Sequence, residues 1–389
     1  PGRAGERIER RQVSFLELFY DLVYVALIAR LAHDFSNNIT QAGIISFVCL
    51  FIIVWWAWIN GTLYHDLHGN NDIRTRVFTF LQMLGVVAMS VFAHDAVGEN
   101  SVGFALSYSF FQLVLTLLWW RTGVHDADHR PLSRPYVAVF LLNTLLFAGS
   151  VFFEENIRYW IWFIAMIFSL ILPLISLMAG IWNEAARSQI KLVTAVTPSL
   201  VERFGLFSII VLGEVVAAVV YGTSSLEMSF HVGIAATLGV IIAISLWWIY
   251  FDFISHRIPK TGLINFSFWY YLHLPMTIGI VTVGSALQNI IKQKSALIPF
   301  NIQSAFIIAI SITLLCVAFL MKTIQKDTES KLIFRNAGIA MVFSALALIP
   351  FIWIAINYLI LLSASIVLLI LPVMVGFLTW IRTLNTNSN

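Results

Sequence analysis

The chain has 389 residues, of which 59% are hydrophobic and 11% are charged, and its formal net charge is +3. A soluble globular protein has about 45–50% apolar and about 25% charged residues, so this composition excludes a water-soluble fold. The apolar residues gather in runs of about 18 to 25, the length of a helix that crosses a bilayer, and do not alternate as in a membrane barrel. We therefore predict an all-α polytopic membrane protein.

The apolar runs predict about twelve transmembrane helices. In chain order they cover residues 14–33, 43–62, 77–95, 102–120, 135–153, 158–180, 200–222, 230–251, 266–287, 302–321, 336–356 and 358–380. The first run follows a basic leader, and its length favours a retained helix over a cleaved signal peptide. The last two runs are separated almost only by Asn357, which leaves a tight reversal or a tilted re-entrant segment as alternatives. Arg335 and Arg382 bracket the pair and favour two helices.

The distribution of Lys and Arg predicts the orientation, because cytoplasmic loops retain positive charge. With the amino terminus inside, four of the 23 basic residues fall on the outer side, and these are Arg30, Arg158, Lys292 and Lys294. We therefore expect both termini in the cytoplasm. The positive net charge then reflects topology and contact with anionic membrane lipids. No basic and aromatic pattern typical of a nucleic-acid partner is present in the sequence.

An internal repeat is predicted because unusual residues recur after about 193 positions. Arg10 and Asp21 match Arg203 and Glu214, the run Trp55-Trp56-Ala57-Trp58 matches Trp247-Trp248-Ile249-Tyr250, and Arg121 with Asp126 matches Lys322 with Asp327. An even number of helices in each half makes the two repeats parallel. The predicted organisation is a cytoplasmic leader (1–13), two six-helix repeats (14–180 and 200–382), a cytoplasmic linker (181–199) and a tail (383–389).

A second alignment competes with the first. Ser14 with Glu17 and Ser199 with Glu202 both have the spacing of a capping box, in which the serine accepts from the third helical amide and the glutamate reaches back. Aligning these two helix starts places the two intramembrane acids roughly 10 Å and 22 Å from them, at 1.5 Å per residue. In that alignment the acids lie at different depths.

The intramembrane acids Asp21 and Glu214 are the main candidates for a functional site, because a charge in hydrocarbon costs about 3 kcal/mol unless protein or water compensates it. Glu17 and Tyr24 share one face of the first helix with Asp21. On a functional interpretation these residues line a pathway for a cation or a proton. On a structural interpretation Glu17 only caps its helix, and Asp21 pairs with a basic residue. The candidate partners are Arg10, Arg11 and Arg203.

His273 is a further candidate for the pathway, because Pro275 follows it within the ninth predicted helix and broken helices mark many transporter sites. The alternative is a kinked helix in which a carbonyl satisfies the histidine. Aromatic residues favour the membrane interface. We expect such an inner-interface position for Trp55, Trp56, Trp247, Trp248 and Asp252.

The sequence gives little support for metal or cofactor chemistry. The runs His65-Asp66-Leu67-His68 and His125-Asp126-Ala127-Asp128-His129 resemble ligand pairs, but both fall in predicted loops without a third cluster, so no metal is expected. Cys49 and Cys316 lie in apolar runs and are expected to pack there. Nucleotide-binding and hydrolase motifs are absent from the sequence. We expect no cofactor and no enzyme activity.

Several sequence segments form a specific combination: residues 16–23 (LELFYDLV), Trp55-Trp56-Ala57-Trp58, 202–207 (ERFGLF), 211–214 (VLGE), 247–252 (WWIYFD) and His273-Leu274-Pro275. Through these segments the chain resembles the bacterial low temperature requirement A (LtrA) family of membrane proteins. Tyr20 stands where the family commonly has phenylalanine. The resemblance implies a multi-pass protein of the bacterial inner membrane with a role in growth at low temperature, and it implies no defined biochemical activity.

Three classes of function remain open from the sequence. The first is a channel or transporter for an ion, a proton or a small solute, with Asp21 and Glu214 in the pathway between the two halves. The second is a lipid-handling protein or lipid enzyme of the inner leaflet that uses Glu17, Asp21 and Arg203. The third is a non-conducting structural or signalling protein, in which arginines fully pair the acids. Membrane lipids are expected partners in each class, and a homo-oligomer is compatible with all three.

Overall fold

The computed structural model describes residues 13–69, 72–127, 129–179, 194, 196–224, 226–293, 297–326 and 330–387. These residues form twelve α-helices and one short 3₁₀ helix, η1. The bounds are α1 (Phe15–Asn37), α2 (Gln41–His68), α3 (Ile73–Ala93), α4 (Ser101–His125), α5 (Arg130–Ser150), α6 (Glu155–Ala179), α8 (Pro198–Thr223), α9 (Phe230–Phe253), α10 (Leu263–Lys292), α11 (Phe300–Thr323), α12 (Ser330–Leu348), η1 (Ile349–Ile352) and α13 (Tyr358–Asn387). Each predicted span overlaps one of these helices.

The all-α membrane fold is confirmed. Among the described residues, 10 helices are long and apolar enough to cross a membrane, counting α12 together with η1 as one span. Helix α1 is not among them because it carries the charged side chains of Glu17, Asp21, Arg30 and Asp34. Its polar face therefore requires partners within the protein, which the site below supplies.

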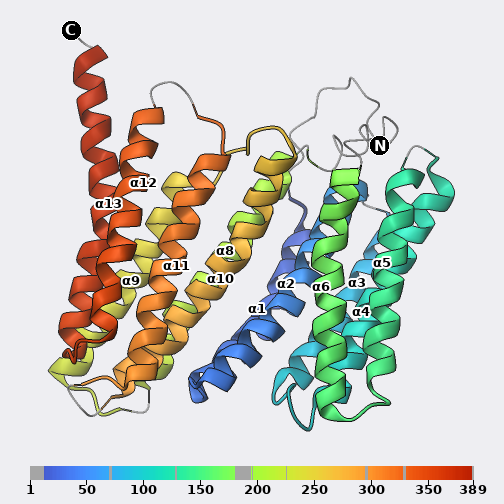
Figure 1. The fold of residues 1–389 in the computed structure, drawn as a ribbon, viewed down its shortest axis with the longest axis horizontal. Coiled ribbons are helices and arrows are strands. Elements are labelled where there is room, and N and C mark those ends of the chain that lie inside the picture. Colours follow the sequence, from blue (N-terminus) through green and yellow to red (C-terminus); the bar gives the residue numbers. More distant parts are fainter. Residues whose placement is uncertain are drawn as a thin grey trace. The chain divides into compact units, whose positions relative to one another are not determined.

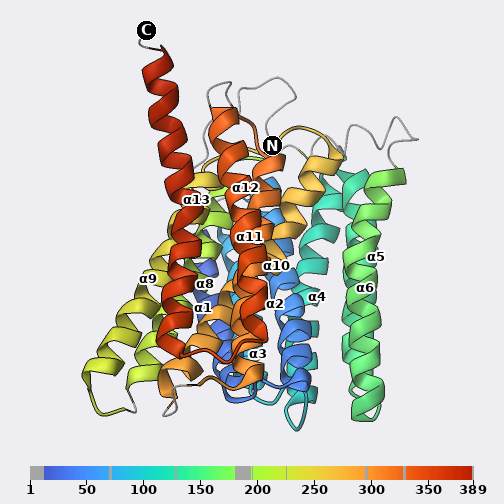
Figure 2. The same ribbon diagram turned by 60° about the vertical axis from the view of Figure 1, so that its left-hand side comes forward.

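The chain folds into two compact units. Unit 1 consists of residues 1–34, 45–203 and 261–263, and unit 2 of 35–44, 204–260 and 264–389. Within unit 1, α4 packs on both α3 and α5, and α5 packs on α6. Within unit 2, α12 packs between α11 and α13, and α13 also packs on α9; Figures 1 and 2 show α11, α12 and α13 as neighbours. The predicted parallel repeats stay a prediction.

The last two predicted helices are separated at the residue that the sequence indicated. Helix α12 continues as η1, and α13 begins one residue after Asn357. The Asn357 side chain accepts a 2.9 Å hydrogen bond from the backbone N–H of Leu359, and Asn357 also pairs with Leu297 in an isolated bridge. Asn357 therefore caps α13 and fixes a reversal between two separate helices.

Helix α3 begins at an N-cap outside the membrane-spanning segments. The Asp72 carboxylate accepts a 2.7 Å hydrogen bond from the backbone N–H of Thr75. Hydrogen bonds from Thr75 hold the pKa of Asp72 below its ordinary value of 3.8. A carboxyl whose folded-state pKa is lowered stabilises the protein above its unfolded-state pKa, and loses that contribution as the pH falls through the lowered value. The cap is therefore at full strength above about pH 4.

We expect Asp72→Ala to lower the free energy of unfolding by about 1 kcal/mol at neutral pH, because it leaves the first amides of α3 without an acceptor. Asp72→Asn is expected to keep the cap, since asparagine is an equally good N-cap, and to remove the part of the acid destabilisation that this carboxyl causes. Thermal unfolding in detergent across the acidic range measures both effects. An Asp72→Asn protein that loses stability with acid as steeply as the unmodified chain contradicts this assignment.

Candidate functional site

Helix α1 starts with the capping box that its sequence predicts. The Ser14 hydroxyl accepts a 3.3 Å hydrogen bond from the backbone N–H of Glu17, whose carboxylate accepts 2.9 Å and 3.0 Å bonds from the Ser14 amide and hydroxyl. Only 3% of Glu17 is exposed. The structure thus gives Glu17 the capping role that was its structural interpretation.

The start of α8 differs from the prediction. Its N-cap is Thr197, whose hydroxyl accepts a 3.0 Å bond from the backbone N–H of Leu200, and Pro198 occupies the first helical position, where its missing N–H is not needed. Ser199 Oγ has no hydrogen-bond partner among the described residues, and Glu202 is exposed, so the predicted Ser199 and Glu202 capping box is wrong. Proline at the first position fixed the boundary two residues earlier than the pattern suggested.

The same threonine ties α8 to α2. Thr197 Oγ1 lies 2.7 Å and 2.8 Å from the two carboxylate oxygens of Asp66 and donates its proton to them. Asp66 belongs to the last turn of α2, which reaches His68 and so extends six residues past its predicted end. The run from His65 to His68 is therefore helical, which corrects its predicted loop conformation.

The two caps place Asp21 and Arg203 at matching depths on their helices. Asp21 follows its N-cap, Ser14, by seven residues, and Arg203 follows Thr197 by six, so each lies roughly 9–10 Å from its helix start at 1.5 Å per residue. Helices that begin at the same end of unit 1 can therefore bring these two side chains level. The repeat alignment pairs Asp21 with Glu214 as equivalent positions. The distance from the helix start instead places Asp21 level with Arg203.

Asp21 and Arg203 form a buried, bidentate ion pair within unit 1. Arg203 Nε donates to Asp21 Oδ2 at 3.1 Å, and Arg203 Nη2 donates to Asp21 Oδ1 at 2.5 Å. The side chains are 0% and 3% exposed for Arg203 and Asp21 respectively. Paired geometry of this kind gives a charged hydrogen bond both strength and direction. Of the three predicted partners, Arg203 is confirmed, and Arg10 and Arg11 lie outside the described residues.

Aromatic side chains enclose this ion pair. Trp58 Nε1 on α2 donates a 2.8 Å hydrogen bond to Asp21 Oδ1, and the Arg203 guanidinium carbon lies 5.5 Å from the centre of the Tyr20 ring. The hydroxyls of Tyr20 and Tyr24 are 3.1 Å apart, and both tyrosines are fully buried. We call Tyr20, Asp21, Tyr24, Trp58, Gly61 and Arg203 the α1–α2–α8 cluster.

Gly61 lets the cluster close. A Cβ atom at this position would overlap the Tyr20 hydroxyl and lie 2.9 Å from Tyr20 Cζ. Trp58, Gly61 and His65 follow one another at helical spacing, so a single face of α2 covers the Tyr20 and Asp21 face of α1. The His65 ring lies 5.5 Å from the Tyr20 ring and completes that face.

The cluster is nearly saturated in hydrogen bonds, with one exception. Arg203 Nη1 is buried and has no hydrogen-bond partner among the described residues. The other two guanidinium nitrogens, Nε and Nη2, both donate to Asp21. The arrangement fixes the start of α8 against α1 and α2, and the positive charge of Arg203 already compensates the Asp21 carboxylate.

Glu214 has a different environment. It follows Pro198 by 16 residues on α8, roughly 24 Å along the helix, and it is 9% exposed. Its carboxylate forms neither a hydrogen bond nor an ion pair with any described residue. A Cβ atom built on Gly284 of α10 would lie 3.2 Å from the Glu214 carbonyl oxygen, so the two backbones approach closely at this level of unit 2.

His273 is satisfied on both sides of its ring. Its Nδ1 lies 2.7 Å from the Trp269 carbonyl oxygen, one turn earlier on α10, and its Nε2 lies 3.2 Å from the Tyr250 hydroxyl. A neutral ring that donates from Nδ1 and accepts at Nε2 fits both contacts. Helix α10 continues without interruption through Pro275. The broken-helix expectation at this proline is therefore wrong, and His273 has the structural environment.

The predicted interfacial aromatics divide into two groups. Trp247 and Trp248 are 47% exposed near the end of α9, and Trp248 Nε1 donates a 2.6 Å hydrogen bond to Asp252, as an interfacial position allows. Trp55 and Trp56 are 0% and 1% exposed in the middle of α2. These two belong to the interior of unit 1, which corrects their expected place at the inner interface.

The two histidine-rich runs do not assemble a ligand set in the described part of the chain. His65 Nε2 bonds Gln82 Oε1 at 3.2 Å, while His129 Nδ1 bonds Asp126 Oδ2 at 2.6 Å. No three His, Cys, Asp or Glu side chains of the described residues converge on one point. The rings of His68 and His129 lie 5.0 Å apart, as an aromatic contact.

The sequence missed three contributors to this region: Trp58 as a donor to Asp21, Gly61 as the space for Tyr20, and Thr197 as the link to Asp66. Trp58 appeared only as part of an aromatic run. A signal for the first two existed, because positions 58, 61 and 65 share a helix face. For Thr197, the proline that follows it was the available signal.

Comparison of the sequence with known proteins identifies its family. The sequence matches, over residues 12–373, the profile of a family described as bacterial low temperature requirement A protein (LtrA). It is also similar to a protein of Rhizobium meliloti (strain 1021) described as uncharacterized protein RA0937, with 26% identity over 289 residues, covering 71% of this chain and 69% of that protein. The matched range includes α1 and α8, and hence Asp21, Arg203 and Glu214. The chain therefore belongs to the bacterial low temperature requirement A (LtrA) family.

Proposed function

We propose that this protein is a transport protein of the bacterial inner membrane, in which the carboxyl group of Glu214 binds a proton or a small cation. The observation that supports the proposal is the lack of any described partner for Glu214, which lies in the second half of an apolar helix. An ionised carboxylate in such surroundings requires several kcal/mol of compensation. A proton or a cation supplies that compensation, and its exchange at this position is the elementary step of a coupled pathway.

The two acids have separate roles in this proposal. Asp21 is the anionic half of a fixed ion pair that fastens the start of α8 to α1, and Glu214 lies eleven residues beyond Arg203 on the same helix, roughly 16 Å further along. A helix anchored at one end and carrying an unpaired carboxyl near its middle suits a protein that loads an ion within the membrane. Both termini are cytoplasmic in this proposal, following the bias of the basic residues.

The alternatives receive less support from these surroundings. A lipid enzyme that used Glu17, Asp21 and Arg203 would need a headgroup to reach residues that are 3%, 2% and 0% exposed. A non-conducting protein would have both acids paired with arginine. Asp21 fits that description, whereas Glu214 lacks a described arginine partner. The transport proposal accounts for the difference between the two carboxyls.

Flux through purified protein in liposomes tests the proposal. If the substrate is a proton, we expect a potassium diffusion potential set with valinomycin to drive proton entry, read by pyranine fluorescence. If it is a cation, we expect an outward gradient of that unlabelled cation to drive entry of radioactive rubidium or sodium. Glu214→Gln removes the ionisable group with little change in shape, and it is expected to reduce the flux to the leak of protein-free liposomes.

Glu202→Gln is the matched control, because Glu202 lies on the same helix and is exposed in its first turn. This variant should carry the flux of the unmodified protein. Equal flux through the Glu214→Gln and unmodified proteins would remove Glu214 from the pathway. If the unmodified protein carried neither protons nor either cation, the transport proposal would be wrong.

A further inference from the structure

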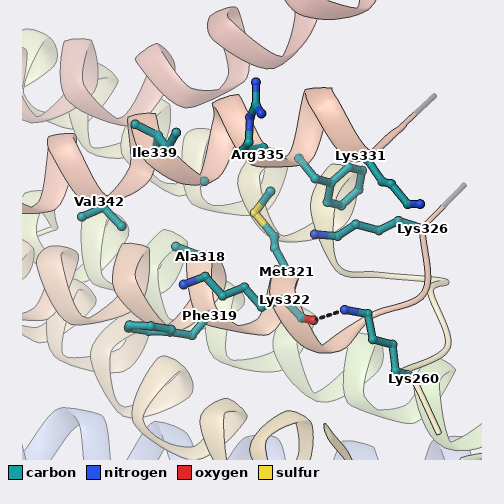
Figure 3. A pocket seen from close by; sticks show the side chains of 12 residues that line it. Lys260, Ala318, Phe319, Met321, Lys322, Lys326, Lys331, Arg335, Ile339 and Val342 are labelled. Atoms are coloured by element: carbon teal, nitrogen blue, oxygen red, sulfur yellow. Dashed lines mark hydrogen bonds between the residues drawn. The ribbon is translucent and has the colours of Figure 1, made fainter. Parts of the chain in front are cut away.

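A pocket of about 700 Å³ lies between α11 and α12 in unit 2. Figure 3 shows it from close by. Lys260, Lys326 and Lys331 gather at one end, whereas the Lys322 amine lies 4.9 Å from the centre of the Phe319 ring. Its basic residues are Lys260, Lys322, Lys326, Lys331 and Arg335, and its other residues are Ala318, Phe319, Met321, Phe334, Gly338, Ile339 and Val342. We call it the α11–α12 pocket.

A short backbone bridge brings the basic residues together from separate segments. Pro259 pairs with Ile324 in an antiparallel bridge, which joins the α9–α10 connection to the segment that follows α11. The Lys260 amide donates to the Thr323 carbonyl at 2.7 Å, and the Gln325 amide donates to the carbonyl of residue 258 at 3.0 Å. Lys260 is thereby held at the end of α11, where its amine bonds the Lys322 carbonyl at 2.8 Å.

The pocket has five basic side chains, and the described acidic residues do not neutralise them. None of the five forms an ion pair with a described acid. Lys331 and Arg335 are one turn apart on α12, a spacing at which like charges repel. Burial lowers the pKa of Lys326, and the nearby charges of Lys260, Lys322 and Arg257 lower it further. A bound anion would relieve this repulsion.

The apolar part of the pocket continues along the two helices, beyond Lys331 and Arg335 on α12. Phe319 is 49% exposed, and Ile339 is 62% exposed, one turn beyond Arg335 on α12 (Figure 3). From Lys331 to Val342 the surface changes from basic to apolar over roughly 16 Å of helix. A soluble anion would leave this apolar end uncovered, whereas an amphiphile matches both ends.

A smaller pocket of the same kind occurs in unit 1, between α4 and α5. Its volume is about 410 Å³, and it contains Arg130 and Arg134 beside Trp119 and Trp120. These arginines precede Lys331 and Arg335 by 201 positions each, the same offset that separates Arg121 from Lys322. Arg130 Nε bonds the carbonyl of Gly123 at 2.8 Å, near the end of α4, as Lys260 does at the end of α11. A pair of basic residues one turn apart therefore lines a pocket in unit 1 as well.

We propose that the α11–α12 pocket binds one anionic phospholipid, with its phosphate among Lys260, Lys326 and Lys331 and its acyl chains over the apolar end. Basic pockets between membrane helices on the cytoplasmic side are suited to such headgroups. The site is separate from Glu214, and the proposal does not depend on transport.

Native mass spectrometry of the full-length protein, delipidated in a neutral detergent, tests this site. Dioleoyl phosphatidylglycerol and dioleoyl phosphatidylcholine have the same acyl chains and differ in headgroup charge. We expect one phosphatidylglycerol to bind with a dissociation constant roughly tenfold below that of phosphatidylcholine. The double variant Lys331→Gln/Arg335→Gln should lose most of this preference.

The matched control is Arg74→Gln/Arg76→Gln, which removes two exposed charges from the first turn of α3 and leaves the pocket intact. It should retain the preference. Similar losses in the two double variants, or equal binding of the two lipids, would overturn the proposal. A third experiment adds inorganic phosphate or glycerol 3-phosphate as a competitor of the bound lipid. If either displaces phosphatidylglycerol at a concentration similar to the lipid's own dissociation constant, the pocket binds a soluble anion and the lipid proposal is wrong.

Discussion

Replacing Arg203 by alanine is expected to lower the free energy of unfolding by about 3–5 kcal/mol, because it leaves the Asp21 carboxylate charged and buried without its cation. Trp58 would remain as its only described donor, and one neutral hydrogen bond does not compensate a full charge. Equilibrium unfolding in mixed micelles of a mild detergent and SDS measures the change. The loss should exceed that caused by removing Arg30 of α1, whose ion pair with Asp34 is partly exposed.

A double-mutant cycle separates the ion pair from other roles of Arg203. Asp21→Asn combined with Arg203→Met removes both charges, and it should be more stable than the sum of the two single losses predicts by at least about 1 kcal/mol. The control is Arg30→Ala on α1, which breaks a partly exposed pair with Asp34 at 3.4 Å; the side chains are 37% and 26% exposed. That change should cost no more than about 1 kcal/mol. Strictly additive single losses would show that the two buried charges are not coupled.

Gly61→Ala is expected to destabilise the protein by about 1–3 kcal/mol, or more if the helices cannot separate. The added methyl group would overlap the Tyr20 hydroxyl, which is itself held by Tyr24 and by the packing beneath Arg203. Alanine is the better helix former by about 1 kcal/mol, so any loss occurs against that gain. Chemical unfolding and the yield of monodisperse protein both report it.

Two companion variants identify the cause. Gly233→Ala lies within α9 at a position where an added Cβ meets nothing within 4 Å, and it should be neutral or slightly stabilising. Tyr20→Phe removes the overlapping oxygen, so the pair Gly61→Ala/Tyr20→Phe should recover part of the stability lost by Gly61→Ala alone. No recovery in the double variant would mean that Gly61 is required by the main chain and not by overlap with the Tyr20 hydroxyl.

The sequence predicted the all-α membrane fold because the length of an apolar run is a local signal. The orientation inferred from the basic residues stays a prediction. The sequence also predicted that Asp21 needs a partner and included Arg203 among three candidates. The choice among them depended on helix register, and that register depends on where each helix begins. The Ser14 cap was readable, but Pro198 moved the other helix start to Thr197, which a capping-box search based on serine and glutamate overlooks.

The remaining differences have the same origin in packing. Trp55 and Trp56 have the composition of an interfacial pair, yet α2 buries them, because interior position depends on which helices surround α2 and not on its own sequence. His273 suggested a broken helix beside Pro275, but a carbonyl one turn earlier and the Tyr250 hydroxyl satisfy the ring in a continuous helix. Such partners lie on the same or another helix, and only the three-dimensional structure identifies them.

The bridge between the α9–α10 connection and the segment after α11 makes this part of the surface tolerant of sequence drift. Two of its bonds join main-chain amides to main-chain carbonyls, so nearly any side chain can occupy positions 258, 260, 323 and 325 without breaking these two. The further bonds from the Lys260 amine and the Gln325 side chain depend on those side chains. Proline is the exception at Lys260 and Gln325, because it lacks the N–H that each of these residues donates. Substitutions at these positions can therefore change the charge of this rim while its main-chain bridge remains.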